Sequence, residues 1–238
     1  MNWVKPVGSM ILLLSLAALA SAFVPADDDY LCDSPQELSF YNFSRWFSYE
    51  LPIKVHIPAM PYKIPQPGLY SATVQKAFQS WSAAVPELRF QFVKDPKQAQ
   101  ILVKWVELLP DSESVWGASM FPQASFNAQR RLVHHTVLHM PIKDQQQPAV
   151  APDEINREDI QPQPVFFTGE DLLALALHQV GHALGLPHSK DLDDIMSTHL
   201  FARVAANNHG TLSKRDAATL RRLYTLPVRM QGSPCNGD

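Results

Sequence analysis

Three histidines in the C-terminal half of the chain have the residue type and the spacing that suit a metal ion. They lie in the stretch HQVGHALGLPHS, residues 178–189. His178 and His182 are four residues apart, so on a helix their imidazoles project from one face and can share one ion. Gly185 permits a sharp turn that brings His188 back as a third nitrogen ligand. Three such ligands, with a fourth position left for water, are typical of a catalytic zinc site.

The elements that carry these ligands can be predicted from the local pattern. Thr168 and Asp171 resemble a capping box, and the apolar stretch LLALALHQVGHAL continues from them as a buried helix. Gly185 can end that helix in the left-handed conformation. A second helix is expected over residues 212–224, LSKRDAATLRRLY, where a Ser and an Asp three residues apart form the cap.

The N-terminal half alternates between strand and helix patterns. Residues 53–57, 88–92 and 101–106 read as strands because apolar residues alternate or run continuously, and residues 71–85 read as an amphipathic helix. Residues 130–140 predict a further strand, placed at an edge because both of its faces carry polar groups. The order of these elements predicts an α/β (α+β) fold.

The stretch HQVGHALGLPHSKDLDDIM resembles the long zinc-binding consensus of the metzincin metalloproteases, His-Glu-x-x-His-x-x-Gly-x-x-His followed by a Met-turn. Within the metzincins it is most similar to the matrixins, because Ser189 and Met196 both fit that branch. The resemblance covers roughly residues 45–226. It implies a twisted, mostly parallel sheet with one antiparallel edge strand, one catalytic zinc ion, peptide or protein substrates, and Met196 beneath the metal.

The chain departs from the matrixin pattern before the active-site helix. It lacks the Gly-rich, His- and Asp-containing segment that binds structural zinc and calcium in many matrixins, so neither ion is assigned. The long polar stretch at 141–165 is expected to be a surface connection, and its acidic residues could bind calcium, although a solvated loop is favoured. The acidic residues of this stretch are Asp153, Glu154, Glu158 and Asp159. The histidines expected at the surface are His134, His135, His139, His199 and His209.

A second departure is Gln179, which follows the first histidine where the family has its glutamate. That glutamate accepts a proton from the attacking water and passes it to the leaving amine. A glutamine has nearly the same shape and can hydrogen-bond the water, but it cannot carry the proton. Metal binding and substrate docking should therefore survive, while loss of a general acid/base typically costs about 10²–10⁴ in rate.

Three interpretations follow from this sequence. The first is a zinc endopeptidase of the matrixin type with weak hydrolysis. The second is a catalytically inactive pseudoprotease that binds peptides or a protein partner in its zinc cleft. The third is a structural or storage protein, which is disfavoured because a structural zinc normally has four protein ligands.

The N-terminus has the pattern of a secretory signal peptide. Lys5 precedes an apolar run over residues 10–19, and the small residues at 20–22 end it, so cleavage is expected after position 22. The apolar run is shorter than the roughly 20 residues that a membrane-spanning helix needs. We therefore expect a secreted, extracellular or periplasmic protein with no membrane association after cleavage.

Export makes the two cysteines, Cys32 and Cys235, interpretable. A pair near opposite ends of an exported chain most simply forms a disulfide. The alternative is that Cys32 supplies a thiolate to the metal and blocks the site until it is removed. Asn42 begins a glycosylation sequon, Asn-Phe-Ser.

Composition limits the remaining possibilities. The 238 residues are 46% hydrophobic and 18% charged, which fits one domain with a good core. The formal charge of −3 is too small to indicate a nucleic acid or an anionic membrane as partner, and we expect a monomer. The layout predicted is a signal peptide at 1–22, an N-terminal extension or short pro-segment at 23–44, the metallopeptidase domain at 45–226 and a C-terminal tail at 227–238.

Overall fold

The computed structural model describes residues 29–33, 44–107, 121–144, 165–167, 169–198, 210–226 and 235. Several sequence predictions concern residues outside these ranges and stay predictions. They are the signal peptide at 1–22, the sequon at Asn42, the capping residue Thr168, the acidic residues Asp153, Glu154, Glu158 and Asp159, and the histidines His199 and His209.

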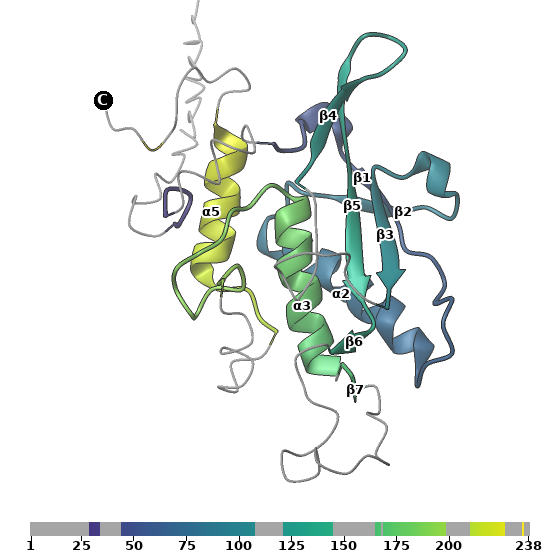
Figure 1. The fold of residues 1–238 in the computed structure, drawn as a ribbon. Coiled ribbons are helices and arrows are strands. Elements are labelled where there is room, and N and C mark those ends of the chain that lie inside the picture. The colour runs from purple at the N-terminus through teal and green to yellow at the C-terminus, as the bar shows by residue number, and fades with distance from the viewer. Residues whose placement is uncertain are drawn as a thin grey trace, which may run out of the picture.

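A five-stranded sheet forms one layer of the fold (Figure 1). Its strands are β1 (Ile53–His56), β2 (Phe90–Phe92), β3 (Ile101–Val106), β4 (Gln123–Phe126) and β5 (Leu132–Pro141). Their order across the sheet is β2-β1-β3-β5-β4, and every neighbouring pair is parallel except β4 with β5. The mostly parallel sheet with one antiparallel edge strand, which the resemblance implied, is confirmed.

The placement of β5 at an edge was wrong. β5 lies inside the sheet, between β3 and β4, and the strand at that edge is β4, which the sequence did not predict. The polar groups of β5 have another reason. His134 is buried and contacts Glu50 in the short 3-10 helix η2 (Ser48–Glu50), while only its neighbour His135 is exposed. The expectation that His134 is a surface residue was therefore also wrong.

Two helices, α2 (Pro67–Ala84) and α3 (Gly169–Ala183), pack against each other and share a core with the sheet. α2 begins four residues before the predicted position 71, because proline is favoured in the first turn of a helix. Residues of β1 and β3 alternate between buried and exposed, so one face of the sheet meets the helices. The indole Nε1 of Trp81 in α2 donates to the carbonyl of Leu177 in α3 at 3.0 Å, which fixes the register of the two helices.

The C-terminal helix α5 (Lys214–Thr225) lies beside α3, on the side away from the sheet (Figure 1). Its predicted cap is confirmed, because the Ser213 side chain accepts from the backbone of Asp216 and the Asp216 side chain accepts from Ser213. Leu220 and Leu223 are buried in the common core. This helix therefore joins the part of the core that borders α3.

The long connection at 141–165 is less irregular than predicted at its two ends. Lys143–Asp144 form β6 and Val165–Phe166 form β7, and the two strands pair antiparallel immediately before α3. A short 3-10 helix, η3 (Pro96–Gln98), precedes β3. Within the described ranges, no helix combines the length and the apolar character needed to cross a membrane.

Candidate metal centre

Helix α3 brings the first two histidines together. His178 and His182 lie one turn apart in the C-terminal half of the helix, and both are buried. Their ring centroids are 4.7 Å apart with the ring planes 87° to one another. The predicted four-residue spacing on one helix face is thus realised in the fold.

Gly185 turns the chain so that His188 returns to the same place. The φ angle of Gly185 is +98°, a conformation that other residues rarely adopt, and its N–H donates to the carbonyl of His182 at 2.9 Å. A Cβ at this position would lie 2.1 Å from the carbonyl oxygen of Ser44, so the close approach of backbone also requires glycine. The ring of His188 then packs 4.6 Å from that of His182, again nearly perpendicular to it.

The three side chains point their Nε2 atoms at one point. Nε2 of His182 lies 3.1 Å from Nε2 of His178 and 3.2 Å from Nε2 of His188. The Nδ1 atoms of His178 and His182 face backbone carbonyls, Ile195 O at 2.7 Å and Leu186 O at 3.0 Å. A carbonyl only accepts, so each Nδ1 carries the proton and each Nε2 of this pair presents a lone pair. Converging lone pairs repel one another and are stabilised by a shared cation.

Burial keeps the central histidine uncharged. It holds the pKa of His182 well below its ordinary value of 6.5, and the neighbouring His178 and His188 lower it further. A neutral imidazole is the form that binds a metal ion. The environment of His182 therefore favours metal over a proton.

The distances suit zinc. Imidazole nitrogens bound to zinc at about 2.0–2.1 Å in a tetrahedral shell lie about 3.3 Å apart, close to the two nitrogen separations of 3.1 and 3.2 Å. Within the described part of the chain, the potential metal-binding group contains these three histidines and no fourth residue. Such a group leaves a coordination position for water or substrate, as in a catalytic site.

Gln179 is held inside the protein next to the first histidine. It is buried on α3, 2% exposed. Gln179 interacts with other residues, although its Oε1 atom accepts no hydrogen bond from the residues described. The carboxamide is neutral and does not take up a proton at ordinary pH, unlike the carboxylate that the family has at this position.

Met196 packs directly against α3. It is fully buried, and a Cβ added at Gly181 would lie 2.3 Å from its Sδ atom. Ser189 N donates to the carbonyl of Met196 at 2.9 Å, which joins the segment after His188 to the segment of Met196. The Met-turn expected from the resemblance thus supports both the helix and the loop that carry the histidines.

The polar side chains behind the Met-turn were not predicted from the sequence. Asp194 is buried and accepts from Ser189 Oγ at 2.5 Å, from Ser213 Oγ at 2.6 Å and from Arg215 at 3.0 Å. Asp216 was predicted as a cap only, but it also accepts from the backbone N–H of Ile195 at 2.9 Å. The capping pattern at Ser213 was the only signal for these roles in the sequence.

The two cysteines are not part of the metal-binding group. Cys32 and Cys235 form a disulfide, as the sequence predicted. Because its sulfur is bonded to Cys235, Cys32 is not a metal ligand in this structure, and that alternative is wrong. His139 lies on β5 within the sheet and, with His134 and His135, does not join the metal-binding group.

A comparison with known protein families agrees with this geometry. The model of the Matrixin family, a peptidase family, matches residues 54–225 of the chain. The matched region contains the three histidines, Gln179 and Met196. The match begins nine residues after the start of the resemblance estimated from the motifs and ends one residue before its end.

Proposed function

The chain belongs to the matrixin family of metalloproteases, and from that premise we propose that it holds one zinc ion through His178, His182 and His188 and hydrolyses peptide bonds slowly. The observation that carries this proposal is the convergence of the three Nε2 atoms, 3.1 and 3.2 Å apart along the cluster. The family implies zinc, and the three-histidine group fits it.

The residues of the chain have separate roles in this proposal. Bound zinc would supply a Lewis acid that polarises the scissile carbonyl and lowers the pKa of a water molecule toward neutrality. Ile195 O and Leu186 O fix the tautomers of His178 and His182 so that Nε2 faces the ion. Gln179 can hydrogen-bond the attacking water and orient it, but it takes no proton from it.

The missing proton acceptor sets the expected rate. Without a general base the reaction depends on water and on the ion alone, and the rate should be about 10²–10⁴ lower than with a carboxylate at the same place. We therefore expect hydrolysis to be weak but measurable. Substrates would be peptides or proteins, because that is what the family cleaves.

A second function is favoured by one observation. The ligands, the Gly185 turn and the Met196 support are all present, while the residue at the proton-transfer position alone differs from the family motif. A chain that keeps its three zinc ligands without the base would still bind peptides or a protein inhibitor at the metal. A purely structural zinc protein is less well supported, because the group of three histidines in the described residues leaves the shell open.

Export from the cytoplasm is part of the proposal. The signal-peptide pattern at residues 1–22 supports it, and so does the Cys32–Cys235 disulfide, since such bonds persist in oxidising compartments. A nucleic-acid partner is not expected because the net charge is small, and a monomer stays part of the proposal.

Cleavage of a diverse peptide library tests the proposed function. The purified, zinc-loaded chain is compared with Gln179→Glu, with a sample treated with a chelator, and with His182→Ala as a metal-free control. Slow cleavage by the wild type that Gln179→Glu accelerates, and that the chelator stops, supports a handicapped protease. Cleavage by Gln179→Glu alone supports the peptide-binding pseudoprotease. If neither the wild type nor Gln179→Glu cleaves with zinc bound, both the slow protease and the pseudoprotease are contradicted.

A further inference from the structure

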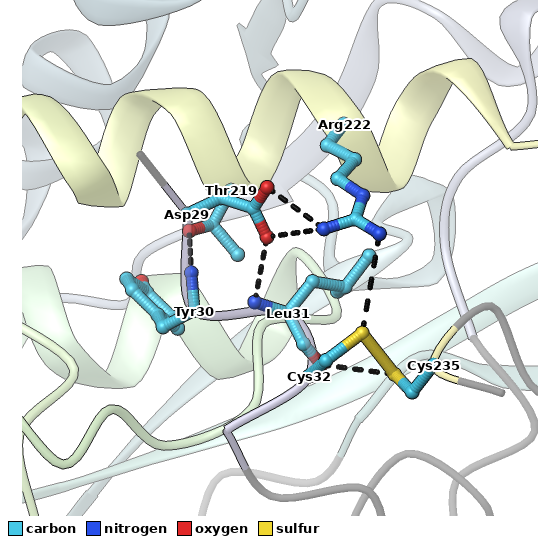
Figure 2. The surroundings of a disulfide bond; sticks show 7 residues. All are labelled: Asp29, Tyr30, Leu31, Cys32, Thr219, Arg222 and Cys235. Atoms are coloured by element: carbon cyan, nitrogen blue, oxygen red, sulfur yellow. Dashed lines mark hydrogen bonds and ion pairs between the residues drawn. A yellow bond between two sulfur atoms is a disulfide. The ribbon is translucent and has the colours of Figure 1, made fainter. Parts of the chain in front are cut away.

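A short segment far from the metal-binding histidines in sequence packs against α5. Asp29 and Tyr30 lie next to that helix (Figure 2), and Tyr30 and Leu31 are fully buried in the core. The backbone N–H of Tyr30 donates to Thr219 Oγ1 of α5 at 3.0 Å. Part of the predicted N-terminal extension is therefore built into the core of the domain.

Two cross-links hold the segment in place. Cys32 is bonded to Cys235, 203 positions along the chain. The Asp29 carboxylate accepts from the Arg222 guanidinium with both oxygens at 2.8 Å, and its Oδ1 also accepts from Leu31 N at 2.9 Å (Figure 2). Charge-assisted pairs of this kind fix geometry as well as adding energy. The segment that carries Tyr30 thus has a defined position on α5.

Hydrogen bonds lead from Tyr30 to the first histidine. The Tyr30 hydroxyl donates to Asp216 Oδ1 at 2.9 Å. Asp216 Oδ2 accepts from Ile195 N at 2.9 Å, and Ile195 O accepts from Nδ1 of His178 at 2.7 Å. Every step is a normal hydrogen-bond distance between buried groups, so a shift of Tyr30 can be transmitted to the imidazole of His178.

A second path leads from the same segment to the loop of His188. Arg215 of α5 contacts Asp33 at 3.4 Å and Asp194 at 3.0 Å. Asp194 accepts from Ser189 Oγ at 2.5 Å, and Ser189 directly follows His188. Residues 29–33 are therefore connected to ligands on both α3 and the following loop.

The carboxylate in the middle of the first path depends on its donors. Burial raises the pKa of Asp216, while hydrogen bonds from the backbone of Ile195 and Ser213 and from the Tyr30 hydroxyl oppose that rise. Burial also raises the pKa of Tyr30 well above its ordinary value of 10.0, so its hydroxyl stays a donor. Removing that donor leaves a buried carboxylate with one partner fewer, and the backbone at Ile195 has to adjust.

We propose that the disulfide-fixed segment 29–33 positions the metal-binding histidines, with Tyr30 as the positioning residue. The proposal rests on the proposed zinc site. It adds that residues outside the metallopeptidase motif hold the zinc ligands in place. Outer partners of metal ligands typically change metal affinity by about 10–100-fold when they are lost. A segment that acted only as a staple would change the stability of the fold and leave the affinity for zinc unchanged.

The test compares two buried tyrosines, of which only Tyr30 is connected by hydrogen bonds to the metal-binding histidines. Tyr30→Phe removes the donor to Asp216, and Tyr70→Phe removes a hydroxyl that donates to Ile142 O at 3.0 Å and lies on neither path. Zinc affinity is measured by competition with a chelator. We expect Tyr30→Phe to bind zinc about tenfold more weakly and Tyr70→Phe to match the wild type.

A spectroscopic measurement adds a readout that stability alone does not move. The Nδ1–H resonance of His178 in NMR spectra reports its hydrogen bond to Ile195 O, with or without metal. We expect Tyr30→Phe to shift this resonance and Tyr70→Phe to leave it in place. Unfolding by urea, measured on both variants, shows whether the two substitutions destabilise the fold to a similar extent.

The disulfide is tested by the pair of substitutions Cys32→Ser and Cys235→Ser. We expect this variant to lose at least as much zinc affinity as Tyr30→Phe, and the combination of all three changes to lose little more, because they act through one path. Wild-type zinc affinity in Tyr30→Phe, with an unmoved His178 resonance, overturns the inference and leaves the zinc site intact. A wild type that binds no zinc overturns the proposed function. The NMR comparison needs no metal, so it still tests the positioning role in that case.

Discussion

Two buried histidines, His182 and His134, are equally hidden from solvent, at 7% and 5% exposure, but their ring nitrogens meet opposite surroundings. Nδ1 of His182 faces the carbonyl of Leu186, and its Nε2 faces two further imidazoles. Nδ1 of His134 lies 2.8 Å from the carboxylate of Glu50, whose other oxygen accepts from the backbone of His134 at 2.6 Å. Among the described residues, no anionic group pairs with the His182 ring, whereas the His134 ring has one such partner.

The difference shows how burial and chemistry combine. Around His134 the protein supplies a carboxylate as hydrogen-bond partner, and the rings of Trp46 and Phe47 pack edge-on against the imidazole, with centroids 5.9 and 4.8 Å away. This arrangement is complete without a ligand. Around His182 the groups that would complete the site are other metal ligands, so the arrangement is completed by a cation. A buried histidine is a candidate metal ligand when its second nitrogen points at further donors.

The largest expected effect is on the metal centre. His182→Ala removes the central nitrogen of the cluster, and the loss of zinc affinity should exceed the roughly 10–100-fold that loss of an outer partner costs. Chelator competition measures it, with His135→Ala, an exposed histidine on β5, as the matched control. Equal zinc affinity in the two variants would remove His182 from the site.

The second effect belongs to the other histidine. His134→Ala removes the imidazole partner of the buried Glu50 carboxylate and leaves it only its backbone donors, which should destabilise the fold by about 1–3 kcal/mol while zinc still binds the three ligands. Urea unfolding gives the free energy, and His135→Ala should change it by no more than about 0.5 kcal/mol. A His134→Ala protein that is stable but has lost zinc would reverse the assignment of the two sites.

A third effect concerns the support under the metal centre. Gly181→Ala places a Cβ 2.3 Å from Sδ of Met196, and such overpacking should cost about 1–3 kcal/mol. Gly68→Ala in α2 is the control, because nothing lies within 4 Å of a Cβ there, and alanine is favoured in helices. Thermal unfolding of both variants is the measurement. A Gly181→Ala protein as stable as Gly68→Ala would show that Met196 does not pack against α3 as described.

The smallest effect is a pH dependence at Glu50. Burial raises the pKa of its carboxyl, but hydrogen bonds from the His134 side chain and from the backbone of Phe47 and His134 outweigh it, so the pKa is below the ordinary 4.5. Its stabilising contribution is therefore fully present above the ordinary pKa and is lost as the pH falls through the lowered value.

Glu50→Gln tests this sign. It should lower the free energy of unfolding by about 1 kcal/mol at neutral pH, and the difference from the wild type should shrink as the pH falls below 4.5. Urea unfolding at a series of pH values gives both curves, and the exposed Glu87→Gln serves as control. A gap that grows in acid would mean that the carboxylate is not stabilised by His134.

The sequence predicted those features whose determinants are local. His178, His182, Gly185 and His188 lie within eleven residues, and helix geometry alone brings the first two together. The cap of α5 at Ser213 and the strand at residues 101–106 were found for the same reason. Periodicity and short spacing are physical consequences of one backbone conformation, so they can be read without knowing the fold.

The features that were missed depend on distant partners. Glu50 and His134 are 84 positions apart, and Tyr30 and Asp216 are 186 apart. β4 has no alternation of apolar and polar residues, because its side chains are mostly exposed, and it is defined by pairing with β5. Nothing local distinguishes the buried His134 from the exposed His135 beside it, since the sheet order decides which side chain meets Glu50.

The zinc content and the zinc coordination of the purified wild-type chain test the central claim most directly. X-ray absorption at the zinc edge, combined with metal analysis, counts the ions and identifies their ligands. We expect one ion per chain, bound by three imidazole nitrogens at about 2.0–2.1 Å. A chain that retains no zinc, or one whose zinc has a sulfur ligand or four protein ligands, would contradict an open site built from His178, His182 and His188.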